Sequence, residues 1–370
     1  MKTNMTIKKQ LIIALLFVGI TPFLIMGITS YIKSDAALDS EAHAKLEMAR
    51  DLKKAQLESY VGFVDGAIGM LGQSADVNTI FDALVHLHDK HHVGASEPFH
   101  ITGESDVKKV YKKYDNYFKS FIDKYKLYDL FILCKPHGHV MYSVAKEGDL
   151  GENLKVGQLR DSGLGEAWRE AVSKRRTVFV DMRPYAPSGD APAMFMGTPI
   201  VGADGEMKGV VAVQLSEKAI NEIMQTRAGM GEAGETYLVG SDKLMRSDSF
   251  LDPTNHSIKA SFANPSTGSV DTDASNAALA GKTGTEIVID YNGHPVLSSY
   301  TEVDFFGVKW ALLAEIDESE VFGALYDSRN SAIIMGLVFL AVIIAIALFL
   351  GRFISNPIIR AVESIMGANS

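Results

Sequence analysis

The apolar stretch AIIMGLVFLAVIIAIALFL, at residues 332–350, decides the fold, because it lies in a run from Asn330 to Gly351 that has no charged residue. A second charge-free run extends from Gln10 to Ile32 and contains LIIALLFVGITPFLIMGI. About 20 apolar residues suffice to cross the hydrocarbon layer of a membrane. Both runs therefore predict transmembrane helices, at residues 10–32 and 330–351, with a folded region between them.

Basic residues at the two ends predict the orientation of the chain. Lys2, Lys8 and Lys9 precede the first run, whereas Arg352 and Arg360 follow the second. Because basic residues gather on the cytoplasmic side of spanning helices, residues 1–9 and 352–370 are predicted to be cytoplasmic. The middle of the chain then lies outside the cytoplasmic (inner) membrane, in the periplasm or the extracellular space. A cleaved signal peptide is the alternative for the first run, but the run is longer than the usual apolar region of a signal peptide and no clear A-x-A site follows it.

Composition narrows the class of protein. The 370 residues are 47% hydrophobic and 22% charged, with a net charge of -9. This acidic balance argues against a nucleic-acid partner, which requires a basic surface. Cys134 is the only cysteine, so the exported region is held together by its own core and has no internal disulfide.

A long helix is predicted to leave the membrane after the first span, because no proline occurs between Lys33 and Glu97. Its apolar residues recur at spacings of three and four: Leu57, Tyr60, Val64, Ala67 and Leu71. A second helix is predicted at about 106–126, and then the period of the pattern changes. Strands are predicted at 129–134, 140–144, 177–181, 194–201 and 209–215, with helices at 164–174 and 217–227.

A second, smaller set of elements follows. Strands are predicted at 236–240, 244–247, 284–290, 296–301 and 308–316, with a loop-rich stretch after the second of them. Asn292–Gly293 is a typical two-residue hairpin turn. A last helix from Glu318 enters the second span. The fold class is therefore α+β, with two antiparallel modules at residues 33–227 and 228–329 between two transmembrane helices.

Four blocks of sequence resemble one known family. They are GLGEAWREA at 163–171, TVFVDMRPY at 177–185, MFMGTPI at 194–200 and GEAGETYLVGSDKLMRSD at 231–248. Together with the long helix and the two modules, they make the chain similar to the double-Cache (dCache) sensor region of bacterial methyl-accepting chemotaxis proteins. The resemblance implies two tandem PAS-like modules, of which the membrane-distal one usually binds the ligand. A homodimer is also expected, because the long helix would bury its second face against a second copy.

The residues after the second span, RFISNPI at 352–358, resemble the start of a HAMP domain. The sequence ends at Ser370, before one HAMP unit is complete. We therefore expect a receptor fragment or a truncated product, in which contacts with a cytoplasmic kinase and adaptor need a further C-terminal region.

No catalytic motif is present, and we expect a sensor that is not an enzyme and has no cofactor. The histidines His86, His88, His91 and His92 invite a metal hypothesis, because His88 and His92 would share a helix face. No cysteine or glutamate lies nearby in the sequence to complete such a site. We therefore expect no metal ligands here, and interpret the cluster as a solvated helix end.

The candidate ligand-binding residues are aromatic and polar: Tyr142, Trp168, Asp181, Arg183, Tyr185, Phe195 and Gln214. In the amino-acid-binding branch of the family, the resemblance places a tyrosine at Trp168, an arginine at Gly165 and an aspartate at Gln214. A neutral amide cannot replace the aspartate that grips an ammonium group. An α-amino acid is therefore not favoured, and we expect an organic acid or another small polar metabolite, which Arg183 would bind.

The predicted function is extracytoplasmic sensing of a small molecule and signalling across the membrane, as the sensory part of a chemotaxis receptor. The alternatives are the sensor of a histidine kinase or nucleotide cyclase, or a membrane-tethered binding protein without its own output.

Overall fold

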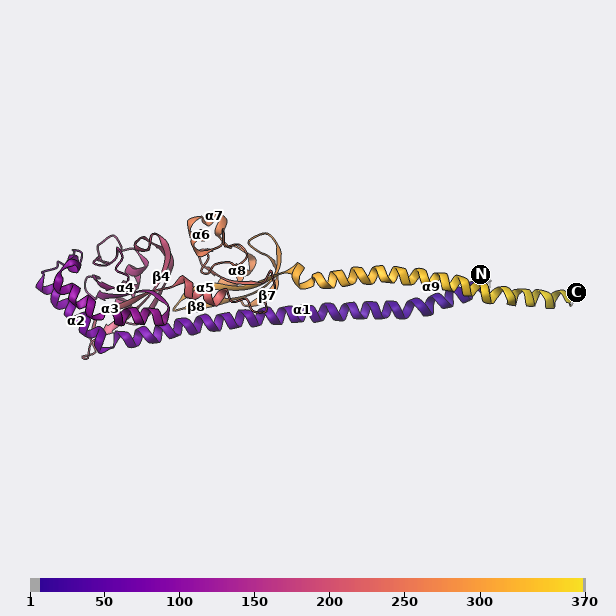
Figure 1. Ribbon diagram of the computed structural model, residues 1–370, viewed down its shortest axis with the longest axis horizontal. Coiled ribbons are helices and arrows are strands. Elements are labelled where there is room, and N and C mark those ends of the chain that lie inside the picture. Colours follow the sequence, from indigo (N-terminus) through magenta and orange to yellow (C-terminus); the bar gives the residue numbers. More distant parts are fainter. Residues whose placement is uncertain (1–6, 369–370) are drawn as a thin grey trace. The chain divides into compact units, whose positions relative to one another are not determined.

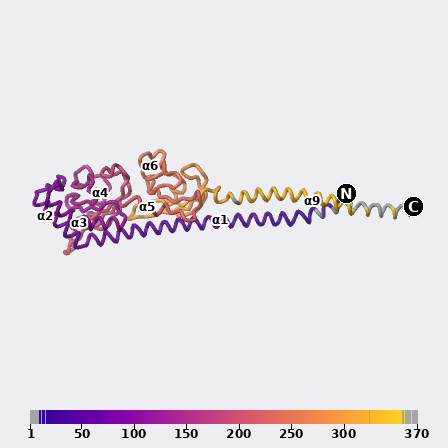
Figure 2. Tube along the Cα trace, in the orientation of Figure 1, coloured from indigo at the N-terminus to yellow at the C-terminus, as the bar shows by residue number. Residues whose placement is uncertain are grey.

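The computed structural model describes residues 7–368, and the described chain forms two compact units. Residues 45–317 form one unit, and the segments before and after it form the other. The first helix, α1 (Ile7–Gly72), and the last, α9 (Glu318–Ala368), begin and end the described chain, as the trace in Figure 2 shows. The unit at 45–317 contains two antiparallel sheets, and some of their strands are labelled in Figure 1. The α+β class predicted from the sequence is therefore confirmed.

Helices α1 and α9 each contain a segment that is long and apolar enough to cross a membrane. Large apolar side chains in both segments are exposed, among them Met26 at 74% and Ile334 at 63%. Such a density of exposed apolar surface is stable in hydrocarbon and costly in water. Within this unit, Phe23 stacks on Phe339 with ring centroids 5.6 Å apart. The two spans predicted from the sequence lie within these helices.

The predicted long helix is interrupted between α1 and α2 (Ala75–Lys90). Ser74 begins α2 by accepting a hydrogen bond from the Val77 amide, which is the usual role of an N-cap serine. A Cβ at Gly72 would lie 2.4 Å from the Pro199 carbonyl oxygen, so only glycine allows the chain to approach the sheet here. The interruption therefore depends on a contact with a strand more than a hundred residues away.

The distal module is a five-stranded antiparallel sheet in the order β2-β1-β5-β4-β3. Its strands are β1 (Leu127–Cys134), β2 (Val140–Ser143), β3 (Val178–Tyr185), β4 (Ala191–Val201) and β5 (Met207–Leu215). One face packs on α1, α2 and α3 (Ser105–Tyr125), and α4 (Gly163–Lys174) covers the other face. Because the side chains of a strand alternate between faces, each strand contributes to both cores. Helix α5 (Glu217–Met224) leads out of this module.

The proximal module is a four-stranded antiparallel sheet in the order β6-β9-β8-β7. Its strands are β6 (Glu235–Gly240), β7 (Gly284–Ile289), β8 (Pro295–Phe305) and β9 (Val308–Asp317). The predicted strand at 244–247 is wrong, because only a single bridge joins Met245 to Val239. The stretch predicted to be loop-rich contains three short helices: α6 (Ile258–Ala263), α7 (Pro265–Gly268) and α8 (Asp273–Leu279).

Candidate functional site

The α4 face of the distal sheet carries the candidate ligand site. In the strand register, Gln214 lies directly between Asp129 on β1 and Phe195 on β4, so these three side chains share a face. Phe195 belongs to the core beneath α4, which fixes the shared face as the one that α4 covers. The Asp129 carboxylate, the Gln214 amide and the Phe195 ring are therefore neighbours in the interior of the module.

Asp149, in the loop after β2, brings a buried carboxyl group to this region. Its Oδ2 accepts a hydrogen bond from the Tyr185 hydroxyl at 2.9 Å, whereas its buried Oδ1 has no partner among the described residues. Burial raises the pKa of the Asp149 carboxyl to about 7, and the nearby charges of Asp129 and Glu147 act in the same direction. The hydrogen bond from Tyr185 acts in the opposite direction. This carboxyl group can therefore accept a further hydrogen bond or, when ionised, form an ion pair with a cation.

Gln214 also has a buried oxygen without a hydrogen-bond partner among the described residues. Its Nε2 donates to the Ser188 hydroxyl at 3.4 Å, but its buried Oε1 has no partner in the described part of the chain. Ser188 in turn donates to Glu147, two residues from Asp149, at 3.1 Å. The two unpaired oxygens of Asp149 and Gln214 therefore belong to one polar cluster. Each of the two oxygens can accept a hydrogen bond.

Asp129, in the same sheet, is a buried carboxylate with hydrogen-bond donors on both of its oxygens. Its Oδ1 accepts the amides of Leu130, Val144 and Ala145, and its Oδ2 accepts the Ser143 hydroxyl at 2.7 Å. Burial nevertheless raises the pKa of Asp129. With its lone pairs engaged in the structure, Asp129 supports the β1–β2 turn and contributes negative potential to the cluster.

Aromatic rings lie on the same face of the sheet as the polar cluster. The rings of Tyr185 and Phe195 meet edge to face with centroids 4.9 Å apart, and Phe131 lies 6.3 Å from Phe195. Trp168, on α4, is buried and donates its indole N–H to the Cys134 carbonyl oxygen at 2.9 Å. Its polar edge is thus engaged with the last residue of β1, and its ring packs in the core beneath α4.

Arg183 lies near the start of α4 and is paired with Glu166 of that helix at 2.5 Å. Both side chains are more than a third exposed, so this pair lies at the rim and not inside the polar cluster. A carboxylate ligand would have to compete with Glu166 for the guanidinium group.

Two of the predicted site residues are not brought to this face. Tyr142 pairs with Ile132 in the β1–β2 ladder and therefore points to the opposite side, where its hydroxyl donates to Asp115 at 2.9 Å. Asp181 accepts both hydrogen bonds of a bidentate contact with Arg246 and one from Trp310 of the proximal module. Trp168, Tyr185 and Phe195 do share the core beneath α4. Gln214 is paired with Phe195 on the same face, and Arg183 lies at the edge.

Asp149 was missed in the sequence because it lies in a loop without a recognisable motif. The only signal in the sequence is an acidic residue just after a predicted strand, which is common in solvated loops. Its burial depends on packing against β3, a strand that lies further along the chain. The missing arginine at Gly165 also has a structural reason, because a Cβ there would lie 2.4 Å from the Arg160 carbonyl oxygen.

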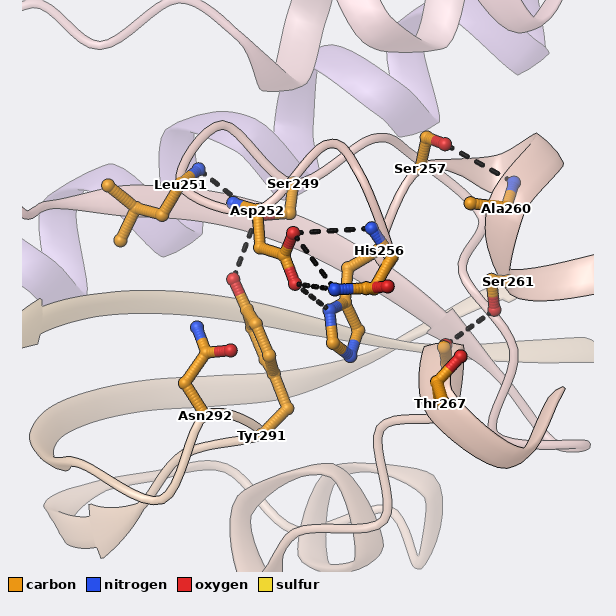
Figure 3. A network of polar contacts seen from close by, with 12 residues as sticks. Ser249, Leu251, Asp252, His256, Ser257, Ala260, Ser261, Thr267, Tyr291 and Asn292 are labelled. Atoms are coloured by element: carbon orange, nitrogen blue, oxygen red, sulfur yellow. Dashed lines mark hydrogen bonds and ion pairs between the residues drawn. The ribbon is translucent and has the colours of Figure 1, made fainter. Parts of the chain in front are cut away.

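The proximal module has buried polar groups too, but they are paired. Glu235 accepts hydrogen bonds from Ser249, Tyr291 and two backbone amides, and Glu315 accepts from Ser298 and Tyr237. Figure 3 shows the loop at this site, where Asp252 contacts His256 at 2.8 Å and the Ser249 hydroxyl lies beside Tyr291. This closed network supports the sheet.

The unpaired polar atoms distinguish the two modules. Among the described residues, five buried side-chain atoms lack a hydrogen-bond partner, and all five lie in the distal module: Asn78 Oδ1, His88 Nε2, His139 Nδ1, Asp149 Oδ1 and Gln214 Oε1. Buried polar atoms in native proteins are nearly always paired with protein groups, ordered water or a ligand, so these five atoms mark where such a partner can bind. The distal module is therefore the candidate ligand-binding module.

Comparison with known proteins identifies the class. The model of the Cache domain family matches residues 32–325. The chain therefore belongs to the Cache domain family, the double-Cache sensors predicted from its sequence. A comparison with curated protein sequences gives no match.

Several solved sensor domains are similar to this chain. The periplasmic sensory domain of the Campylobacter jejuni chemoreceptor Tlp1 is 13% identical, with a TM-score of 0.50 over 77% of this chain and 98% of its own. The ligand-binding domain of the Pseudomonas aeruginosa amino acid chemoreceptor PctB, in complex with L-Arg, is 13% identical (TM-score 0.47, 79% and 94% covered). The extracellular domain of soHK1S-Z6, assigned as a histidine kinase, is 14% identical (TM-score 0.47, 79% and 99% covered). The protein is thus a Cache sensor flanked by two candidate membrane helices.

Proposed function

We propose that this protein is the sensory part of a chemotaxis receptor, and that its distal module binds a small molecule carrying N–H donors. The observation that supports this ligand class is the pair of buried, unpaired oxygens on Asp149 and Gln214. An ammonium or amide group of a ligand would donate to both atoms, and an ammonium group would also neutralise Asp149. Organic acids, which the sequence suggested, would meet the negative potential of Asp129, Asp149 and Glu147.

The polar cluster explains how a ligand can change the structure. Asp149 and Gln214 are joined through Tyr185, Ser188 and Glu147 to β3, to the turn after it and to the loop after β2. A ligand that binds both oxygens would draw these segments together over the sheet. It can shift the receptor between two arrangements only by binding one of them more tightly. A change from 1:99 to 99:1 requires about 5.5 kcal/mol of differential affinity.

A thermal-shift screen of the full chain in detergent tests the ligand class. The compounds are primary amines, amides, organic acids and sugars of similar size. We expect stabilisation by N–H donors, and loss of that shift in Asp149→Asn if the donor is charged. Asp115→Asn is the matched control, because Asp115 bonds Tyr142 on the opposite face of the same sheet. Stabilisation by organic acids alone, retained in Asp149→Asn, contradicts the proposal.

Chemotaxis is the output we propose, with a histidine kinase or cyclase sensor as the second candidate. The sequence blocks shared with methyl-accepting chemotaxis proteins and the HAMP-like residues after the second span favour the first. A chimera that joins residues 1–351 to the HAMP and signalling region of a characterised chemoreceptor tests it. Ligand-dependent swimming of a receptorless strain supports the proposal, and a ligand that stabilises the sensor but never changes swimming contradicts it.

We also propose that the region between the two spans lies on the opposite side of the cytoplasmic membrane from both chain ends. We further propose that the protein forms a homodimer. One face of α1 is buried against the modules by residues such as Leu57, Val64 and Ile68. A second, exposed apolar stripe follows the opposite face: Met48, Leu52, Phe63 and Met70, each at least 55% exposed. The spacings of 4, 11 and 7 residues keep these side chains on one side of the helix. A second copy of α1 is the partner that such a stripe fits.

A further inference from the structure

Three histidines meet at the end of the distal module, outside the ligand cluster. His88 lies on α2, and His137 and His139 lie on either side of Gly138 in the turn between β1 and β2. One ring nitrogen of each lies within 4.8 Å of one from both others. The pairing of His88 with His92 that the sequence suggested does not form. Helix α2 ends at Lys90, and His92 has a left-handed backbone with φ of 52°.

The hydrogen bonds of His139 determine which of its nitrogens is free. Its Nε2 lies 2.8 Å from the Glu97 carbonyl oxygen, which can only accept. The Asn153 amide nitrogen is also 3.1 Å from this Nε2, but its two hydrogens are donated to the carbonyl oxygens of Ala95 and Glu97, so Nε2 of His139 carries the proton. The Nδ1 atom is therefore a lone pair. It is buried and has no partner in the described chain, and the His139 side chain is fully buried.

His88 is arranged in the same way. Its Nδ1 lies 3.1 Å from a carboxylate oxygen of Asp89, so Nδ1 donates to that carboxylate. The Nε2 lone pair is then free, and it too is buried without a partner among the residues described. Metal-binding histidines almost always donate their second nitrogen to a carboxylate or a backbone carbonyl. His88 shows the first arrangement and His139 the second.

His137 is the third ring of the group. Its ring lies 6.0 Å from that of His88 and 5.3 Å from that of His139, centroid to centroid. Each of the three side chains therefore has an imidazole nitrogen close enough to share one ion.

We propose that His88, His137 and His139 form a site for a late first-row divalent metal ion, with Zn²⁺ as the first candidate. Three imidazole nitrogens suit Zn²⁺, Cu²⁺ or Ni²⁺, whereas Mg²⁺ and Ca²⁺ need oxygen ligands. Zn–N bonds of about 2.0–2.1 Å with tetrahedral angles place ligand atoms about 3.4 Å apart. The three nitrogens, within 4.8 Å of one another, therefore need to approach by about an ångström. His137, in the turn and only partly buried, is the ring best placed to move.

Metal binding at this site would act on the helix that covers the ligand cluster. A Cβ at Gly138, between two of the ligands, would lie 3.0 Å from the ring of Trp168. Trp168 also donates to the carbonyl oxygen of Cys134 in the same hairpin. An ion that ties this hairpin to α2 therefore fixes a surface against which α4 packs. The metal ion would then be either a second ligand that the receptor senses or a structural ion that stabilises the module that binds the small molecule.

Zinc titration of the full chain, purified in detergent without a histidine tag and treated with chelator, tests the site. A chromophoric chelator competes for the ion, and Co²⁺ is the spectroscopic probe. We expect one Zn²⁺ per chain, the absorption of tetrahedral Co²⁺, and at least a tenfold loss of affinity in both His88→Ala and His137→Ala. The matched control is His86→Ala, since His86 is exposed on the same helix and outside the group.

The two variants remove ligands from different elements, so a folding defect in one leaves the other informative. Circular dichroism checks that each variant keeps its secondary structure. Equal Zn²⁺ affinity in the wild type and both ligand variants overturns the proposal. It is overturned equally if His86→Ala loses as much affinity as they do.

Discussion

The Asp181 carboxylate of the distal module accepts two hydrogen bonds from the Arg246 guanidinium of the proximal module, each 2.8 Å long. The Trp310 indole N–H, from β9, donates to the same carboxylate at 2.9 Å. Arg246 is almost completely buried. Its guanidinium group lies directly over Gly240 of β6, where an added Cβ would be only 2.2 Å from the Arg246 Cζ, so a residue larger than glycine at this position would displace it. The two modules are therefore joined by a bidentate ion pair in their shared interior.

Breaking this pair should destabilise the region that contains both modules. In Asp181→Ala the buried Arg246 keeps only Asp242 as an acidic partner, at 3.0 Å, and loses two charge-assisted hydrogen bonds, so we expect the free energy of unfolding to fall by about 2–3 kcal/mol. Thermal or denaturant unfolding followed by tryptophan emission measures it, since Trp168 and Trp310 are the only tryptophans. Asp82→Ala is the control: it removes a more exposed pair with Lys208, worth about 1 kcal/mol at most. Equal losses in the two variants would argue against the importance of the Asp181 contact.

Gly165 should resist the arginine that the amino-acid-binding branch has at this position. A Cβ there would lie 2.4 Å and 2.6 Å from the carbonyl oxygens of Arg160 and Leu159, which are backbone atoms that cannot easily move. We expect Gly165→Ala to destabilise the protein by about 1–3 kcal/mol in the same unfolding measurement. Gly148→Ala is the control, because nothing lies within 4 Å of its added Cβ. A neutral Gly165→Ala would show that the start of α4 is free to adjust.

The strands of the distal module could be predicted closely, because their alternation and turns are local signals. The break between α1 and α2 could not, since it depends on Gly72 meeting Pro199 across the fold. The short helices α6 to α8 were also missed. Each is too short to show a helical period, and they lie among turn residues such as Pro253 and Pro265.

Only part of the candidate site could be predicted, because some of its residues are placed by contacts between distant parts of the chain. Trp168, Tyr185, Phe195 and Gln214 lie on the α4 side of the module, and the sequence blocks that carry the family resemblance contain the first three. The face of Tyr142 depends on its register with Ile132, and the partner of Asp181 comes from the other module. Neither relation is visible in the spacing of residues along one strand.

The exposed stripe on α1 should join two copies of the chain. Met70→Cys places a thiol at a position that is 78% exposed, whereas the native Cys134 is buried. We expect disulfide-linked dimers of Met70→Cys in membranes under mild oxidation, seen on a non-reducing gel. A cysteine at Asn292, exposed in the turn after β7, is the control and should give few. Phe63→Glu should weaken association by placing a charge in the stripe, and a linked fraction that does not differ between the two cysteines would contradict the dimer.

The carboxyl of Asp149 should make stability depend on pH. An unfolded aspartate has a pKa near 3.9, whereas burial raises the pKa of Asp149 to about 7 in the folded protein. Between these values the folded state binds more protons, so its stability falls as the pH rises from about 4 to about 7. Asp149→Asn removes this term, and we expect the variant to lose about 3 kcal/mol less than the wild type across that window. Glu315 has its pKa raised to about 7 as well, so part of the wild-type slope remains in the variant.

Binding of an amine should show the opposite trend. A positively charged ligand requires ionised Asp149, and the groups that face this carboxyl are Tyr185, Asp129 and Glu147. Below pH 7 the carboxyl must first lose its proton, so affinity should rise nearly tenfold for each pH unit up to about 7 and then level off. Calorimetric titration at several pH values, in buffers of different ionisation enthalpy, measures both the affinity and the proton released. Asp115→Asn should keep this profile, and a flat profile in the wild type would show that the ligand does not bind the Asp149 carboxylate.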